Sequence, residues 1–160
     1  MREDWNARAL EDAHYYVAFG ERGQTESGFQ DTAGDVVRGI EWALRRLESL
    51  PEGWGAIEIG CGPGRLLRPL SRHFREIHGV DVSDEMVRIA NQRLAGVPNA
   101  RAHVVSGSDL APFPSDFADF VYTYAVFQHI PDAGVVFGYL ADVDRVLRLG
   151  GSLKAPFDGL

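Results

Sequence analysis

The stretch Ala56–Arg65, AIEIGCGPGR, decides the fold. It begins with a short apolar run that carries Glu58, and Gly60, Gly62 and Gly64 then occupy alternate positions before a helical pattern starts. Glycines at this spacing allow a sharp turn with positive φ and let a ligand approach the backbone. The free N–H groups at the start of the following helix favour an anionic group. The stretch therefore predicts a strand, a glycine turn and a helix start that together hold a small charged ligand.

The kind of ligand depends on two positions outside the glycines. A dinucleotide fingerprint, G-x-G-x-x-G, needs its third glycine where Arg65 stands, so it is not met. Downstream, Ile77, Val80 and Val82 predict a second buried strand with Asp81 at its end, where a carboxylate can accept two hydrogen bonds from a ribose diol. The residues favour a ligand with a diol, and a pyrophosphate is not required.

These motifs resemble those of the class I S-adenosylmethionine-dependent methyltransferases, in which an E/D-x-G-x-G-x-G turn follows the first strand and an acidic residue ends the next one. The resemblance runs from about Trp54 to Leu153 and includes residues 112–132, PFPSDFADFVYTYAVFQHIPD, which are similar to the family's fourth-strand motif. It implies an α/β fold with three layers: a Rossmann-like parallel sheet of order 3-2-1-4-5, with helices on both faces. It also implies S-adenosyl-L-methionine as the cofactor.

The resemblance also implies a set of cofactor-binding residues. Asp81 is expected to hold the ribose hydroxyls, and Glu58 to fix the turn or to meet the amino group through water. At the adenine end the register is open between Ser106 with Gly107 and Asp109, and we favour the first pair. The complete expected set is Glu58, Gly60, Cys61, Gly62, Gly64, Asp81, Val82, Met86, Ser106, Gly107, Thr123 and Tyr124.

His129 and Tyr124 are the candidate catalytic residues, since both follow the fourth strand, near where the reactive methyl group is expected to point. Histidine can take a proton near neutral pH. In this family the segment HIPD is frequently structural, so a structural role for His129 stays open. The other histidines show no ligand spacing such as H-E-x-x-H, and no metal site is expected.

Composition limits the class of protein. A chain of 160 residues with 45% apolar content is expected to form one domain with a true core. The net charge of −7 argues against a nucleic-acid partner. Cys61 is the only cysteine, which excludes an internal disulfide, and a chain without disulfides is expected in the cytoplasm. No apolar run is long enough to predict a membrane span. Only one of the 16 basic residues is lysine, a bias that fits a GC-rich bacterial genome.

Apolar periodicity predicts the elements in order. Helices at 1–19 and about 32–50, separated by a loop at 20–28, form an N-terminal helical segment (1–50) that is expected to lie over the cofactor as a lid. Within it, Tyr15, Tyr16 and Phe19 are either substrate contacts or packing residues. The cofactor-binding domain (51–160) follows, with strands expected at 55–60, 76–81, 101–105, 118–123 and 152–157 and helices at 64–73, 84–95 and 133–148.

The chain ends after its fifth predicted strand, whereas members of the family usually continue through a helix and an antiparallel hairpin. We therefore expect a truncated domain that lacks the family's last two strands. Its fifth strand is expected to be an open edge, which either forms a homodimer or borrows the missing strands from elsewhere. The expected function is methyl transfer to a small-molecule acceptor. The alternatives are a cofactor-binding but inactive fragment or interaction module and, disfavoured by Arg65, a nicotinamide oxidoreductase.

Overall fold

A computed structural model describes residues 1–18, 20–47 and 53–156. Three helices precede the sheet: α1 (Arg2–Ala18), α2 (Glu26–Asp31) and α3 (Gly34–Leu44). Strands and helices then alternate as β1 (Gly55–Ile59), α4 (Leu67–Leu70), β2 (Glu76–Asp81), α5 (Asp84–Arg93), β3 (Ala100–Val104), β4 (Ala118–Thr123), α6 (Ala133–Val146) and β5 (Leu147–Lys154). Short 3₁₀ turns lie at Ser71–His73 and Phe127–His129.

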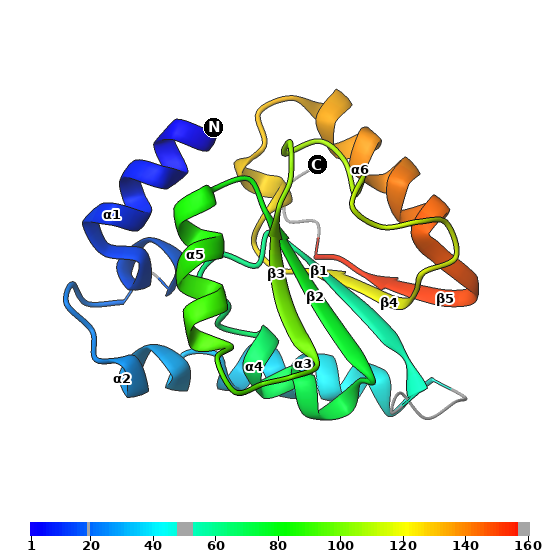
Figure 1. The fold of residues 1–160 in the computed structure, drawn as a ribbon, viewed down its shortest axis with the longest axis horizontal. Helices are drawn as coiled ribbons and strands as arrows, with labels where there is room; N and C mark the ends of the chain where they lie inside the picture. The colour runs from blue at the N-terminus through cyan, green and yellow to red at the C-terminus, as the bar shows by residue number, and fades with distance from the viewer. Residues whose placement is uncertain (19, 48–52, 157–160) are drawn as a thin grey trace.

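The five strands form one parallel sheet of order β3-β2-β1-β4-β5 (Figure 1), which confirms the predicted order. The central strand β1 is buried along its whole length, because a parallel strand is covered on both faces. Successive side chains point to opposite faces, so Ile57 packs on one side and Ala56 on the other.

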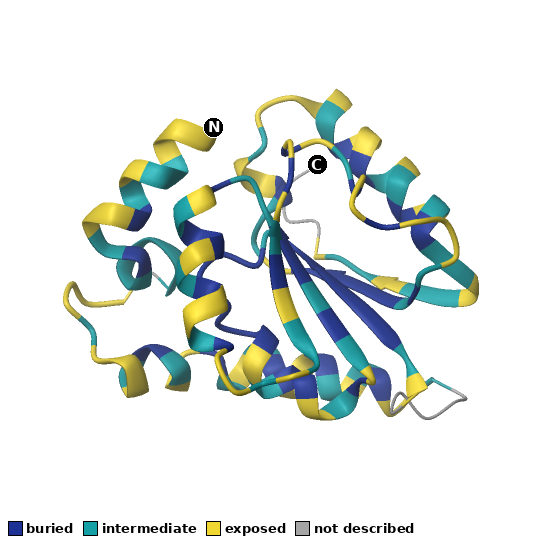
Figure 2. Cartoon of the chain, in the orientation of Figure 1, coloured by how far each residue is buried: buried dark blue, intermediate teal, exposed yellow. Residues whose placement is uncertain are grey.

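Each face of the sheet has its own core. In Figure 2 the strands β1 and β4 are coloured as buried along most of their length. On one face, Ala56, Ile77 and Phe120 belong to a cluster with residues of α3, α4 and α5. On the other face, Ile57 and Val121 pack with α6 and with the segment 105–117, which joins β3 to β4 without a helix. The expected three-layer arrangement is confirmed, with a loop covering part of the second face.

The first helix is broken at Asp12, where a continuous helix was predicted. Asp12 has φ −166° and ψ 89°, outside the helical region. Its carboxylate accepts hydrogen bonds from the backbone N–H groups of Tyr15 at 3.0 Å and Gly23 at 2.9 Å. Aspartate competes with helical hydrogen bonds in this way because its short side chain reaches nearby backbone groups.

Three other predicted boundaries were wrong. The last three residues of the predicted loop 20–28 are helical, because the Thr25 hydroxyl caps α2 by accepting a hydrogen bond from Gly28 N at 3.1 Å. The predicted helix 64–73 is a run of turns up to Leu66, followed by α4 and a 3₁₀ turn. The glycine turn favours non-helical backbone there, and Pro69 has no N–H for a helical bond. The predicted helix 32–50 is shorter in the structure, because α3 ends at Leu44 and turns follow at 45–47. Positions 48–50 lie outside the described residues.

The last strand begins earlier than predicted. α6 ends at Val146 and β5 starts at Leu147, whereas the helix was expected to reach 148 and the strand to cover 152–157. Pairing of Leu147 with Ala118 draws this segment into the sheet, and a register irregularity precedes Ser152. Tertiary pairing overrides local propensity at such positions. Position 157 lies outside the described residues. Within the described ranges, no helix combines the length and apolar character needed to cross a bilayer.

Candidate active site

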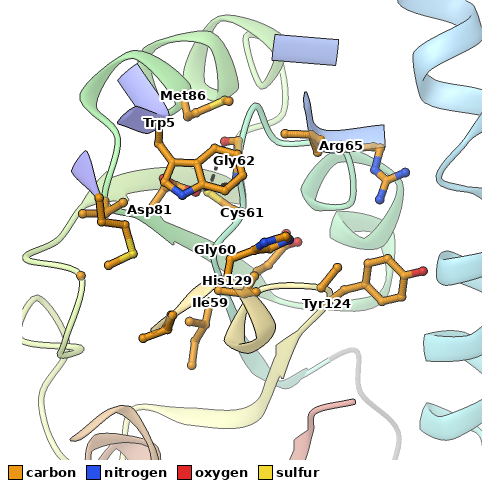
Figure 3. Close-up of a pocket in the computed structure, with 18 of the residues that line it drawn as sticks. Trp5, Ile59, Gly60, Cys61, Gly62, Arg65, Asp81, Met86, Tyr124 and His129 are labelled. Carbon is orange, nitrogen blue, oxygen red and sulfur yellow. Dashed lines mark hydrogen bonds between the residues drawn. The ribbon is translucent and has the colours of Figure 1, made fainter. Parts of the chain in front are cut away.

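A pocket of about 920 Å³, its open mouth included, lies at the carboxyl ends of β1, β2 and β4 (Figure 3). Strand order reverses between β1 and β4, and ligands of open parallel sheets bind at such a reversal. The view in Figure 3 places Trp5, Asp81 and Met86 toward one end of the pocket and Arg65 and Tyr124 toward the other. The pocket therefore brings together residues from the N-terminal helices and from the sheet.

The glycine turn forms one wall of the pocket. The backbone N–H groups of Gly60 and Cys61 both donate to Val80 O, at 2.8 and 3.0 Å, which fixes the turn against β2. Gly60 has φ 70°, and a Cβ atom at this position would lie 2.3 Å from Val126 Cγ2. Only glycine meets both conditions, so the wall presents bare backbone to a ligand.

Asp81, at the end of β2, is bonded to this turn. Its Oδ2 accepts a hydrogen bond from Gly62 N and its Oδ1 one from Ser83 N, both at 2.9 Å. Burial raises the pKa of Asp81, while these backbone bonds act in the opposite direction. A carboxylate has about four acceptor positions. Asp81 can therefore accept further hydrogen bonds from a ligand in the pocket that it lines.

Glu58 is the second acidic residue of the pocket. It is only 3% exposed, and the Tyr122 hydroxyl donates to its Oε2 at 3.0 Å. Burial raises the pKa of Glu58 to about 8, although the Tyr122 hydrogen bond lowers it. The carboxyl group is therefore mainly protonated at neutral pH, unlike an ordinary surface glutamate.

Helix α1 contributes Trp5, Tyr16 and Val17 to the pocket lining. The ring of Trp5 meets that of His129 edge-on, with 5.9 Å between their centroids. The helix is held on α5 by Asn6, whose Oδ1 accepts a hydrogen bond from Ser83 Oγ at 2.6 Å. Of the aromatic residues expected in the lid, Tyr16 lines the pocket, Tyr15 is not among the lining residues, and Phe19 lies outside the described residues.

The pocket gathers most of the residues predicted from the sequence. Those that line it are Glu58, Gly60, Cys61, Gly62, Asp81, Val82, Met86, Gly107, Tyr124 and His129. Gly64, Ser106 and Thr123 are not among its lining residues. A Cβ atom at Gly64 would lie 3.1 Å from Ala90 Cβ, so this glycine allows the turn to approach α5. Ser106 is exposed and donates a hydrogen bond to Asp109 at 2.5 Å.

Several lining residues were not assigned to the site from the sequence. Ala125 follows β4 with φ 54°, an unfavourable value for a residue with a side chain, and Arg65 follows the glycine turn. Their positions next to predicted motifs are the only signal the sequence offers. The remaining unassigned residues are Met1, Trp5, Val17, Ile59, Leu66, Val126, Ile130 and Tyr139. Among the described residues, no three His, Cys, Asp or Glu side chains are grouped so that they could hold a metal ion.

Comparison with known proteins gives concordant results. A family model described as "Methyltransferase domain" matches residues 57–154. Demethylmenaquinone methyltransferase from Tropheryma whipplei (strain Twist) is 30% identical over 111 residues, which cover 69% of this chain and 44% of that protein. Trans-aconitate 2-methyltransferase from Variovorax paradoxus (strain S110) is 37% identical over 87 residues, 52% of this chain and 31% of that protein. The chain thus spans less than half the length of these curated relatives.

A solved structure shows the same fold. Haemonchus contortus phosphoethanolamine N-methyltransferase 1, in complex with phosphoethanolamine and S-adenosylhomocysteine, superposes with a TM-score of 0.74. The alignment covers 94% of this chain and 30% of that protein, at 18% identity, and supports the fold alone. Because the family model covers more than half of the residues, the chain belongs to the class I S-adenosylmethionine-dependent methyltransferases.

Proposed function

We propose that this chain transfers a methyl group from S-adenosylmethionine to a small-molecule acceptor bound in the pocket. The observation that carries the proposal is the contact between the glycine turn and Asp81, where Gly62 N donates to Asp81 Oδ2 at 2.9 Å. It places a side-chain-free wall beside a carboxylate with unused acceptor positions. This arrangement fits an adenosyl cofactor. The ribose diol of such a cofactor needs hydrogen-bond acceptors, and its methionine part needs a surface of bare backbone.

The remaining residues of the pocket suit the rest of the cofactor. In the proposal, Asp81 accepts hydrogen bonds from both ribose hydroxyls, and the apolar side chains of Val82 and Met86 cover the adenine. Gly107 has φ 96° and a Cβ atom there would lie 2.8 Å from Val82 Cγ2, so its backbone lies close to this end of the pocket. Gly64, Ser106 and Thr123 do not line the pocket. In the proposal they hold the backbone segments around the cofactor in place.

The bound cofactor supplies an electrophilic methyl group on a sulfonium. The chain has to hold the acceptor in line with it and exclude water, and such orientation can lower a barrier by roughly 7–11 kcal/mol. Trp5 and Tyr16 suit this task because they bring apolar surface from α1 to the pocket. His129, held edge-on against Trp5, is the proposed general base, which removes a proton from the molecule that is methylated. Tyr124, which is 44% exposed, is the proposed positioning group.

A general base would add about 10²–10⁴-fold to the rate for a hydroxyl acceptor. An amine that binds in its neutral form needs no strong base, so the contribution of His129 depends on the acceptor. The names of the relatives describe methylation of small molecules, and we propose an acceptor of that class for this chain. No observation favours the alternative of an inactive cofactor-binding module.

Calorimetric titration with S-adenosylhomocysteine and with NAD, followed by a methyl-transfer assay over a metabolite panel, tests the proposal. We expect saturable binding of S-adenosylhomocysteine, none of NAD, and labelled product from at least one metabolite. Binding of NAD in place of S-adenosylhomocysteine would replace the proposal with an oxidoreductase. Cofactor binding without product from any acceptor would favour the inactive module.

A further inference from the structure

Arg65, the residue that follows the glycine turn, is buried at the edge of the pocket. It is only 7% exposed, and it lines the pocket. Its Nη1 donates to Thr32 O at 3.2 Å and to Thr32 Oγ1 at 3.0 Å. Its Nε is buried and has no hydrogen-bond partner in the described part of the chain. The guanidinium is therefore anchored through one nitrogen and left unsatisfied at another.

This cation also lacks an acidic partner. Within the described ranges, no carboxylate lies at ion-pair distance from the guanidinium, and Glu58 acts on it only through space. Burial lowers the pKa of Arg65, but an arginine side chain stays charged in proteins. Buried charges are rarely left unpaired, because removing an ion from water is costly unless a counter-charge replaces the solvent. The buried guanidinium of Arg65 therefore requires a negatively charged partner, and the described part of the chain does not provide one.

The neighbouring residues do not neutralise it. Glu58 is the acidic residue that interacts electrostatically with Arg65, but its pKa of about 8 leaves it mainly protonated at neutral pH. The carboxylate of Asp81 accepts backbone hydrogen bonds from Gly62 and Ser83, and no ion pair with Arg65 is formed. In Figure 3, Asp81 lies toward the opposite end of the pocket from Arg65. The Arg65 end of the pocket therefore carries an uncompensated positive charge.

The geometry points to Arg65 as the residue that binds a carboxylate inside the pocket, next to Glu58 and Tyr124. A carboxylate suits the site because the guanidinium keeps N–H donors that Thr32 does not use, and a guanidinium–carboxylate pair combines hydrogen bonds with opposite charges. The inference rests on the proposed function. The carboxylate has two sources in that reaction: the amino-acid part of the cofactor or an acidic acceptor.

Calorimetry with two nucleosides separates these sources. S-adenosylhomocysteine carries the amino-acid carboxylate, whereas 5′-methylthioadenosine has the same nucleoside thioether without it. If the cofactor supplies the carboxylate, Arg65→Met weakens binding of S-adenosylhomocysteine by about 10- to 100-fold and leaves that of 5′-methylthioadenosine unchanged. Arg65→Lys keeps the positive charge, so we expect it to lose less affinity for S-adenosylhomocysteine than Arg65→Met.

If the acceptor supplies the carboxylate, Arg65→Met binds S-adenosylhomocysteine as the wild type does. Trans-aconitate, used as a tricarboxylate probe, then binds the wild-type complex with S-adenosylhomocysteine and no longer binds the variant complex. The inference is overturned if S-adenosylhomocysteine affinity is equal in both proteins and trans-aconitate shows no binding that depends on Arg65.

The controls separate a loss of charge from a loss of fold. Equal affinity for 5′-methylthioadenosine shows that the pocket is intact in the variant. If Arg65→Met does not fold, Arg65→Gln, which retains a donor for Thr32, takes its place. A wild-type chain that binds neither nucleoside contradicts the proposed function. A wild-type chain that binds both, with Arg65 variants that behave identically, contradicts only the carboxylate assignment.

Discussion

The backbone N–H of Gly62 donates a 2.9 Å hydrogen bond to Oδ2 of Asp81. The two residues are 19 positions apart: Gly62 lies in the turn that follows β1, and Asp81 ends β2. The bond holds the glycine turn and the carboxylate in one fixed relationship on the wall of the pocket. The proposed cofactor site depends on this relationship, and the first prediction tests it.

Replacing Asp81 with alanine should weaken binding of S-adenosylhomocysteine by about 10- to 150-fold, because hydrogen bonds to a charged group contribute about 1.5–3 kcal/mol. Titration calorimetry measures the change. The control is Asp144→Ala, since Asp144 is an exposed acidic residue on α6 and is expected to leave the affinity unchanged. An Asp81 variant with wild-type affinity would remove this carboxylate from the site.

Gly60→Ala should lower the free energy of unfolding by about 2–4 kcal/mol, since a side chain is strained at φ 70° and its Cβ would overlap Val126. Urea unfolding measures the loss. Gly39→Ala is the matched control, because Gly39 is exposed within α3 and a Cβ there meets nothing within 4 Å. We expect that variant to gain about 0.5–1 kcal/mol from helix propensity. Equal stability of the two variants would contradict the tight packing of the turn.

Between about pH 6.5 and 8 the stability of the protein should fall as pH rises, because the pKa of Glu58 is about 8 in the fold and about 4.3 in an unfolded chain. In this range the folded state binds more protons than the unfolded state, so one such group lowers the free energy of unfolding by up to about 1.4 kcal/mol per pH unit. Between about pH 4 and 6.5 the half-buried His103, whose pKa is lowered to about 4, opposes this effect of Glu58. Burial shifts the pKa of Asp81 in the same direction.

The variant Glu58→Gln stays neutral and keeps an acceptor for Tyr122, so its unfolding free energy should depend less on pH. Urea denaturation at several pH values between about 6.5 and 8 measures both slopes. Glu85→Gln serves as the control, because Arg88 lowers the pKa of that surface carboxylate and moves its titration below the range. Parallel curves for the wild type and Glu58→Gln would show that Glu58 ionises normally.

Trp5→Ala should weaken binding of S-adenosylhomocysteine by about 2- to 10-fold, because it removes an aromatic wall of the pocket and its edge contact with His129. Leu10→Ala, on the same helix but 73% exposed, should bind like the wild type. Calorimetry of both variants decides whether α1 covers the ligand. If the two substitutions have the same effect, α1 contributes only as a packing element.

A homodimer through β5 remains a prediction. β5 is one of the two edge strands of the sheet, and Leu149 on it is fully exposed. If the edge joins two chains, Leu149→Lys should shift the sedimenting species from dimer to monomer, because a charged side chain opposes edge pairing. Phe137→Lys, at an exposed position of α6, should leave the distribution unchanged. A wild-type protein that sediments as a monomer at every concentration would contradict the dimer.

Some features could be predicted from the sequence because each depends on a few consecutive residues. The glycine turn after β1 and the acidic residue that ends β2 each lie within one short motif, and Ser83 at the start of α5 is an N-cap that bonds Met86 N as such a residue should. Boundaries that depend on distant partners were missed. β5 starts at Leu147 because Ala118 pairs with it across the sheet.

The sequence by itself determined that a glycine turn follows β1 and that a carboxylate ends β2, because glycine content and strand ends are local properties of the chain. Only the tertiary structure decided that Trp5 meets His129 and that the Arg65 guanidinium is buried, with no carboxylate at ion-pair distance among the described residues. The desolvation that leaves Glu58 mainly protonated belongs to the same group. These features arise from segments that folding brings together, and no pattern along the chain records how closely those segments pack.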